Sequence, residues 1–210
     1  TALYNGSTTY MGNATTAAFN VDKHDSFVHV TPGDADVGGD VTIHVEVPAG
    51  ATGYVYLDIN GTWYVSLISV GINYPDVTIK GLGNGTYYVH ATYSGDDKFK
   101  PSTNNSETFT VSKVKPDINT VAPAIVVGED GKVTVTVPED ATGTITIEVD
   151  GKKYTAVIKD GKAVFTVPGL KTGKYPIKVH YCGDDKYESS VVDGGYIKVI
   201  EDNGHNGGHG

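Results

Sequence analysis

The chain has 210 residues, enough for one large domain or for two domains of about 100 residues, the size of many β-sandwiches. Its 25 acidic residues against 16 basic ones give a formal charge of −9, and no basic cluster is present that could bind the phosphates of a nucleic acid. No apolar run approaches the roughly 20 residues that cross a bilayer. We therefore expect neither a nucleic-acid partner nor a membrane span in this segment.

The composition favours an all-β fold. Val, Ile, Thr and Tyr are frequent, 27 residues are Gly, and stretches rich in Leu, Met and Ala that would suit helices are missing. These residue types fit pleated, half-buried strands joined by tight turns. The single cysteine, Cys182, cannot form a disulfide within the chain, so cysteine usage gives no information about the compartment.

Residues 1–22 contain a Tyr4-Asn-Gly turn followed by an alternating strand with Ala17, Phe19 and Val21. The same features close the two complete repeats that follow, so this segment is predicted to be an orphan strand segment that resembles the end of a preceding repeat. Two interpretations stay open. The segment ends a repeat that lies before it, or its three apolar residues fill the side-chain sites of a sheet edge in a neighbouring molecule.

Residues 23–112 and 113–201 are predicted to be two copies of one repeat. The alternating strand at 43–47 returns at 133–137, about 90 residues later. In each copy a second alternating strand follows and leads to an Asn-Gly or Asp-Gly pair, the strongest short signal for a two-residue hairpin. About seven short strands in each copy are typical of a β-sandwich.

Both copies close on the same pattern, Gly-x-Tyr-x-Val/Ile-x-x-x-Tyr-x-Gly-Asp, which begins at Gly85 and at Gly173. A Phe/Ile-x-Val strand follows each time. A short link with a proline, near residues 112–116, separates the copies. The last residues, 202–210, are rich in Gly and His and are predicted to be a flexible tail.

This closing pattern resembles the bacterial-type Ig-like repeats that are abundant in large adhesin-like surface proteins of methanogenic archaea and some bacteria. The resemblance covers residues of about 24–200. It implies two tandem immunoglobulin-like Greek-key β-sandwiches, an extracellular or cell-surface location, and no catalytic residue or cofactor. The first copy departs from the second by an insertion, which we place at Ser66–Tyr74 where the second copy has the shorter Ala156–Gly161.

A difference between the copies predicts a contact patch on the first one. Val55, Leu57 and Ile59 point inward on one strand, so alternation turns their neighbours outward. The strand that ends at Tyr93 lies beside it in an immunoglobulin sheet. A contiguous exposed aromatic cluster marks an interface or ligand platform, although cross-strand aromatic pairs also stabilise a sheet. The predicted patch is Tyr54, Tyr56, Trp63, Tyr88 and His90, and the second copy has Thr144, Thr146, Pro176 and Lys178 at matching positions.

Five glycosylation sequons precede residue 107 and none follows it. Such sequons are used in secreted proteins and lie in surface loops, but a chain rich in Thr and Asn also produces them by chance. The candidate asparagines are Asn5, Asn13, Asn60, Asn84 and Asn104.

Several acidic or histidine-containing segments were compared with metal sites. Calcium takes 6–8 oxygen ligands, far more than two adjacent carboxylates supply, so tight turns are the favoured interpretation of the acidic segments. The histidines of the tail lack partners that would orient their rings. We therefore expect no metal site. The segments are Asp96–Asp97, Asp184–Asp185, the loop with Asp34, Asp36 and Asp40, and the pair His205 and His209.

No catalytic constellation is recognisable. The chain lacks a Gly-x-Ser-x-Gly elbow, a His-Glu-x-x-His motif and a cysteine-based motif. An interior of Val, Ile and Tyr leaves no place for the two carboxylates of a glycosidase cleft. We therefore expect a protein without enzymatic activity. An internal isopeptide bond from Lys23 to Asn104 or Asn105 is a further alternative, but ordinary exposed lysines are favoured.

The main functional hypothesis is a structural and adhesive repeat array of an extracellular surface protein. A second hypothesis is a self-assembling filament subunit, in which residues 1–21 add as a strand to the next molecule. A third is a carbohydrate-binding module whose aromatic patch stacks on sugar rings. The expected partners are other copies of the chain or neighbouring repeats, with cell-surface glycans or proteins as alternatives.

Overall fold

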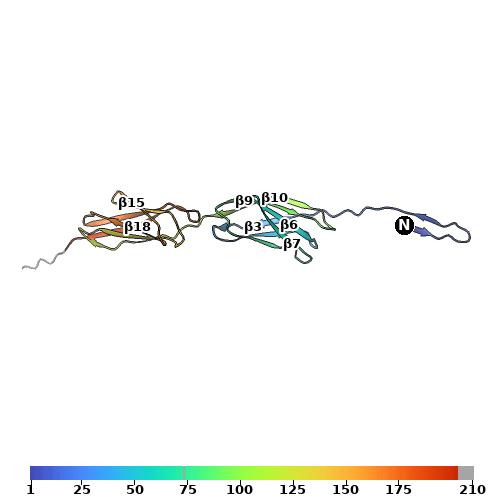
Figure 1. The fold of residues 1–210 in the computed structure, drawn as a ribbon, viewed down its shortest axis with the longest axis horizontal. Helices are drawn as coiled ribbons and strands as arrows, with labels where there is room; N and C mark the ends of the chain where they lie inside the picture. The colour runs from blue at the N-terminus through green and yellow to red at the C-terminus, as the bar shows by residue number, and fades with distance from the viewer. Residues whose placement is uncertain (73, 203–210) are drawn as a thin grey trace, which may run out of the picture. The chain divides into compact units, whose positions relative to one another are not determined.

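The computed structural model describes residues 1–72 and 74–202, and every regular element in these two ranges is a β-strand (Figure 1). Within them, no helix has the length and apolar character needed to cross a membrane. The strand pairings form two sandwiches and a separate N-terminal hairpin. The predicted all-β fold with tandem immunoglobulin-like sandwiches is confirmed. His205 and His209 of the predicted tail lie outside the described residues.

The first sandwich packs a five-stranded sheet against a three-stranded one. The larger sheet has the order β4-β10-β9-β6-β7, with β4 parallel to β10 and β6 antiparallel to both of its neighbours. The smaller sheet has the order β3-β5-β8. Its strands are β3 (His29–Pro32), β4 (Ala35–Asp36), β5 (Val41–Glu46), β6 (Gly53–Ile59), β7 (Thr62–Ile68), β8 (Asp76–Ile79), β9 (Gly85–Tyr93) and β10 (Ser102–Ser112).

The second sandwich repeats this topology strand for strand. Its larger sheet has the order β12-β18-β17-β14-β15, and its smaller sheet the order β11-β13-β16. Its strands are β11 (Asn119–Val121), β12 (Ile125–Val126), β13 (Gly131–Thr136), β14 (Thr144–Val149), β15 (Lys152–Val157), β16 (Lys162–Val167), β17 (Gly173–Tyr181) and β18 (Ser190–Ile200).

The two predicted hairpins form where the Asn-Gly and Asp-Gly pairs occur. Asn60 and Gly61 have φ angles of 49° and 90°, and Asp150 and Gly151 have φ angles of 50° and 71°. Positive φ at both central residues is what a type I′ turn requires, and Asn, Asp and Gly tolerate it best. The side chain of Asp58 adds a 2.7 Å hydrogen bond from the Gly61 N–H. The turns therefore fix the register of β6 with β7 and of β14 with β15.

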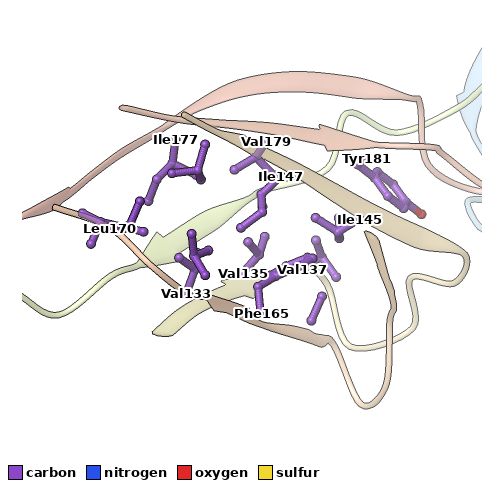
Figure 2. Close-up of a cluster of buried hydrophobic side chains, with 14 of the residues drawn as sticks. Val133, Val135, Val137, Ile145, Ile147, Phe165, Leu170, Ile177, Val179 and Tyr181 are labelled. Carbon is purple, nitrogen blue, oxygen red and sulfur yellow. The ribbon is translucent and has the colours of Figure 1, made fainter. Parts of the chain in front are cut away.

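Each core is built from the inward residues of two facing sheets. In Figure 2, Ile147 and Val179 of the larger sheet of the second sandwich face Val133, Val135 and Phe165 of the smaller sheet. Side chains alternate in and out along a strand, so the sequence period of two becomes one buried and one exposed face. The matching residues buried in the larger sheet of the first sandwich are Val55, Leu57, Ile59, Val89, Ala91 and Tyr93.

A tyrosine and an aspartate fasten the last hairpin of the first sandwich to the loop before β6, and we call this set of contacts the latch. The hydroxyl of Tyr93 donates a 2.7 Å hydrogen bond to the Thr52 carbonyl. One Asp96 oxygen accepts from the Thr52 N–H at 2.7 Å, and the other accepts from the N–H groups of Lys98 and Phe99. The tight-turn interpretation of this acidic segment therefore has a physical basis, because both oxygens serve backbone amides.

The second sandwich carries the same latch. Tyr181 donates to the Thr142 carbonyl at 3.1 Å, and Asp184 accepts from the Thr142 N–H at 2.8 Å. Its other oxygen accepts from the N–H groups of Lys186 and Tyr187. The latch is thus a property of the repeat rather than of one copy.

The latch shifts the acidity of its members. Burial opposes ionisation of Asp96, but the N–H groups of Phe99, Thr52 and Lys98 outweigh it and hold the pKa of this carboxyl well below its usual range. Burial, and then the neighbouring Asp96 carboxylate, raises the pKa of Tyr93 to about 12. The pKa of Asp184 is lowered and that of Tyr181 is raised by the same environment.

The other acidic loop also uses its carboxylates internally. Asp34 accepts a 2.7 Å hydrogen bond from the Thr110 N–H, and Asp40 pairs with Lys80 at 3.0 Å. In the part of the chain that the structure describes, no group of three or more His, Cys, Asp or Glu side chains is placed to hold a metal ion.

The N-terminal segment folds as a short antiparallel hairpin of β1 (Ala2–Tyr4) and β2 (Asn13–Thr15). Residues 16–23 have no regular structure, and Ala17, Phe19 and Val21 are all exposed. The predicted strand at these three residues is therefore not formed within the described chain.

The insertion in the first repeat lies later than predicted. Asp58 pairs with Trp63 just as Glu148 pairs with Lys153, so β6–β7 and β14–β15 keep one register. The turn after β7 is also preserved, since Ser69 bridges to Ile72 as Lys159 bridges to Lys162. The extra residues therefore follow this turn and precede β8. The earlier placement was wrong because the hairpin register tolerates no slip without turning core residues to solvent.

Candidate contact face

The outer face of β7, β6 and β9 in the first sandwich carries most of the predicted patch. Tyr54 and Tyr56 project from β6 on the side opposite to its core residues, with ring centroids 6.2 Å apart and planes tilted by 36°. Trp63 on β7 is opposite Asp58 and is 63% exposed. His90 on β9 is opposite Asp58 from the other side. Four of the five predicted residues thus share one continuous surface.

Tyr88 lies apart from this cluster. The pairing of Asp58 with His90 places these two polar residues between Tyr88 and Tyr56 along the sheet. The Tyr88 N–H donates a 3.1 Å hydrogen bond to the Asn60 side chain, at the hairpin end of the face. The predicted patch is therefore an aromatic cluster with a separate tyrosine at its end.

Sequence reasoning missed the apolar residues of β7. Val65 is opposite Tyr56 and Leu67 is opposite Tyr54, and both are more than half exposed. The signal was present, since Trp63, Val65 and Leu67 alternate with less exposed residues, but it needed the hairpin register to be recognised. We define the contact face as Tyr54, Tyr56, Trp63, Val65, Leu67, Tyr88 and His90.

β7 is also the edge strand of its sheet. Ile59 and Thr62 close the two-residue hairpin, so alternate residues of β7 direct their N–H and C=O groups away from β6. These are Trp63, Val65 and Leu67, the same residues that expose apolar side chains. Residues Thr62–Ile68 include no charged side chain. Natural sheets protect exposed edges with charges or coverage, so an apolar edge suggests a binding function.

The same face of the second sandwich is polar. Thr146 lies between Thr155 and His180 and donates or accepts a 2.8 Å hydrogen bond with Thr155. Glu148 lies between Lys153 and Lys178. The edge strand β15 begins with two lysines, which protect it from pairing with another strand. The contact face is therefore a feature of one copy.

An open hollow of about 650 Å³ adjoins this polar face in the second sandwich. Glu148, Asp150, Lys178 and Asp193 are among its lining residues, and Asp193 accepts a 2.8 Å hydrogen bond from the Gly195 N–H. These acidic residues lie at the surface, not in an enclosed cleft.

The candidate glycosylated asparagines lie at the surface, with differing hydrogen bonds. Asn60 accepts from the Tyr88 N–H, and Asn104 is half-buried and accepts from the Ser106 N–H. Lys23 donates a 2.5 Å hydrogen bond to the Asp96 carbonyl, not to the Asn104 side chain. The exposed sequon residues are Asn5, Asn13, Asn60 and Asn84, and their glycosylation stays a prediction.

Comparison with known families agrees with this geometry for the second sandwich. Residues 118–197 match the model of a family described as bacterial Ig-like domain (group 3). The second sandwich is an Ig-like domain. Because the first sandwich has the same strand order, hairpin and latch, the Ig-like description extends to it on structural grounds. No protein in the curated set matches the chain.

Solved structures with a similar course of the chain include three multidomain proteins. One is a structure of Clostridium thermocellum CbhA fibronectin(III)-like modules, with 19% identity, a TM-score of 0.35, and coverage of 87% of this chain and 99% of that one. A bacterial ice-binding adhesin has 17% identity and a TM-score of 0.41, with 93% and 72% covered. A chimeric titin Z1Z2-Z1Z2 tandem has 16% identity and a TM-score of 0.32, with 82% and 95% covered. No functional conclusion is based on these three.

Proposed function

We propose that this chain is a structural and adhesive segment of an extracellular surface protein, without enzymatic activity. In this proposal residues 23–112 and 113–201 fold as separate sandwich domains, and the contact face of the first binds the partner. The observation that carries it is the apolar outer face with an unprotected edge, which one copy has and the other lacks. A purely structural repeat gains nothing from such a difference, because both copies have the same core.

The cores support the non-enzymatic part of the proposal. Among the described residues, those that are buried are all apolar or aromatic, and none is polar or charged. Catalysis by acids and bases needs such groups held in a site that excludes water.

A face-exchange variant tests the adhesive part. It carries Tyr54→Thr, Tyr56→Thr, Trp63→Lys and Val65→Thr, which are the residues that the second sandwich has at the same positions. The second copy folds with these residues, so the variant should keep its fold. A matched control exchanges Thr144→Ala and Thr155→Ala on the second sandwich.

The wild-type chain and both variants are assayed on an array of microbial cell-surface polysaccharides and on immobilised copies of the chain. The proposal expects binding by the wild type and the control, and at least tenfold weaker binding by the face-exchange variant. Equal binding by all three proteins, or no binding by the wild type to either target, would contradict it.

Assembly through residues 1–21 is a second candidate function. The observation that favours it is the exposure of Ala17, Phe19 and Val21, whose alternation suits a strand but which pair with nothing in the described chain. Strand addition would bury them and satisfy their backbone groups. Deleting residues 1–21 should then convert oligomers into monomers by light scattering, and an unchanged size would exclude the candidate.

Sugar binding is the more specific form of the adhesive proposal. Tyr54 and Tyr56 present two neighbouring rings, and Asp58 and His90 beside them offer polar partners for hydroxyl groups. Titration against the polysaccharides that bind on the array, with Tyr56→Ala as the comparison, distinguishes this form. Binding that is retained in Tyr56→Ala would place the sugar elsewhere.

A further inference from the structure

The N-terminal hairpin repeats the strand pairing that closes the second sandwich. Tyr4 pairs with Asn13 at the start of β2, and Tyr181 pairs with Ser190 at the start of β18. Nine residues separate the partners in both cases, and both strand pairs are antiparallel. β1 and β2 therefore correspond to the end of β17 and the start of β18.

The turn inside the hairpin is the same as well. Gly6 and Gly183 have φ angles of 83° and 77°, a conformation that glycine adopts readily. The Ser7 N–H donates to the Tyr10 carbonyl at 2.8 Å, as the Asp184 N–H donates to the Tyr187 carbonyl at 3.0 Å. These residues thus form one turn in two places.

Ser7 also takes the position of the latch aspartate. Its hydroxyl oxygen accepts from the N–H groups of Thr9 and Tyr10, whereas Asp184 accepts from those of Lys186 and Tyr187. The first sandwich has this arrangement at Asp96. The chain therefore contains three copies of the closing hairpin but two complete sandwiches.

A one-residue difference between the copies has a simple cause. In the second sandwich Pro176 pairs with Tyr196 and Lys178 with Asp193, so β18 holds one extra residue in a bulge. Ile197 follows Tyr181 by 16 residues, whereas Phe19 follows Tyr4 by 15. A pairing without the bulge brings Phe19 to the place that Ile197 occupies. The alternation of Phe19 and Val21 then falls on the core side.

The side chains that would complete a core are exposed. Phe19 and Val21 are 85% and 84% exposed, whereas their counterparts Phe109 and Val111 are 2% and 1% exposed. Tyr4 is half exposed, although its counterpart in each sandwich is fully buried. An isolated two-stranded hairpin is marginal in water, and burial of these side chains is the missing source of stability.

The link that follows the hairpin is repeated too. Lys23 follows Val21 by two residues and donates to the Asp96 carbonyl, and Lys113 follows Val111 by two residues and donates to the Asp184 carbonyl. Each lysine opens a sandwich. Residues 1–21 thus stand before the first sandwich as β9 and β10 stand before the second.

We infer that residues 1–21 are a docking surface for the front strands of a further Ig-like repeat, and that they complete it as its last two strands. The front strands are those equivalent to β3 through β8, and β1 would pair with the strand equivalent to β6, as β9 does in the first sandwich. The inference names the partner for assembly through residues 1–21, and it is independent of the contact face.

A chimeric chain tests the inference. A second copy of residues 24–89 is placed directly before Thr1 in the complete chain, so that Tyr4 follows this front at the spacing of Tyr93. The inference expects a third sandwich, in which the amides of residues 2–4 and 17–21 exchange with solvent at least 100-fold more slowly than in the original chain. In this sandwich Phe19 should stack on the copied Tyr87, as Phe109 stacks on Tyr87 at 5.2 Å in the first sandwich.

Two further chains make the outcome decisive. A reference chain carries a second copy of residues 24–112 before Lys23 in place of residues 1–22, and its folding shows that the front is competent when it has its own ending. The chimera with Phe19→Asp should lose the protection. If the reference chain folds and residues 1–21 of the chimera exchange as in the original chain, the inference is wrong, whatever the deletion of residues 1–21 does to oligomer size.

Discussion

In the first sandwich, Tyr56 lies between Val65 and Thr92 on the outer face of the larger sheet. At the same place in the second sandwich, Thr146 lies between Thr155 and His180. One residue further along each strand, Leu57 and Ile147 are both fully buried. The two copies therefore agree where side chains face the core and differ where they face solvent.

This difference separates what the fold needs from what it leaves free. Close packing restricts the inward residues to similar volumes, whereas an outward residue of a sheet has few neighbours to satisfy. The lysines of β15 give the usual protection of a sheet edge, and β7 lacks it. An unprotected apolar edge carries a risk of aggregation, so we interpret it as a surface with a partner.

The largest expected effect is on the shared core. Leu57→Ala and Ile147→Ala should each destabilise their own sandwich by about 2–5 kcal/mol, because each removes a fully buried side chain and leaves a cavity. Hydrogen exchange during urea unfolding resolves the two sandwiches. A loss confined to one sandwich in both variants would show that the copies do not fold as separate domains.

Removing the latch should have the next largest effect. Asp96→Ala deletes the acceptor for the N–H groups of Thr52, Lys98 and Phe99, and should cost about 1.5–3 kcal/mol. Asp184→Ala should cost the second sandwich a similar amount. The midpoint of urea unfolding measures both, and an effect in one copy alone would contradict the equivalence of the two latches.

The latch also predicts a loss of stability in acid. The pKa of the Asp96 and Asp184 carboxyls lies below the unfolded value of about 3.9, so their stabilisation is complete above about pH 5. It is lost as the pH falls through 4 and below, because the unfolded chain takes up protons first. The urea midpoint measured from pH 7 to pH 2 should fall for both sandwiches. Asp96→Asn should flatten this dependence for the first sandwich and leave that of the second unchanged.

Transfer of the contact face should transfer binding. Thr144→Tyr, Thr146→Tyr, Lys153→Trp and Thr155→Val give the second sandwich the residues of the first. Introduced into the face-exchange variant, they should restore about tenfold in affinity for the polysaccharide or chain that the wild type binds, which corresponds to about 1.4 kcal/mol. Failure of a folded transfer protein to bind would mean that Leu67, Tyr88 or His90 is also required.

The smallest effect distinguishes binding from sheet stabilisation. Tyr54→Thr should lower stability by only about 0.2–1 kcal/mol, the usual range for a cross-strand pair, while it weakens binding. Thermal unfolding and the binding assay together measure this. A stability loss well above this range with unchanged binding would identify the tyrosines as structural.

The sequence predicted the repeat, the hairpins and the inward residues because each depends on local rules. Asn60-Gly61 specifies its turn through backbone preference, and the alternation around Leu57 specifies a face. The position of Tyr88 could not be predicted in this way, since its separation from Tyr56 depends on the register between β6 and β9. Val65 and Leu67 were missed for the same reason, because β7 joins the face only through its pairing with β6.

The N-terminal segment shows the opposite case. Its resemblance to the closing strands was visible in Tyr4, Phe19 and Val21, but its turn and the role of Ser7 needed hydrogen bonds to be recognised. Serine and aspartate share an acceptor oxygen without sharing charge, so pattern matching at this position was not informative.

The most direct test of the account is a titration of the wild type, the face-exchange variant and the matched second-sandwich control against the same immobilised target. The account predicts equal affinity for the wild type and the control and at least a tenfold loss for the face-exchange variant, with all three proteins equally resistant to urea. Undiminished binding by a folded face-exchange variant would contradict it.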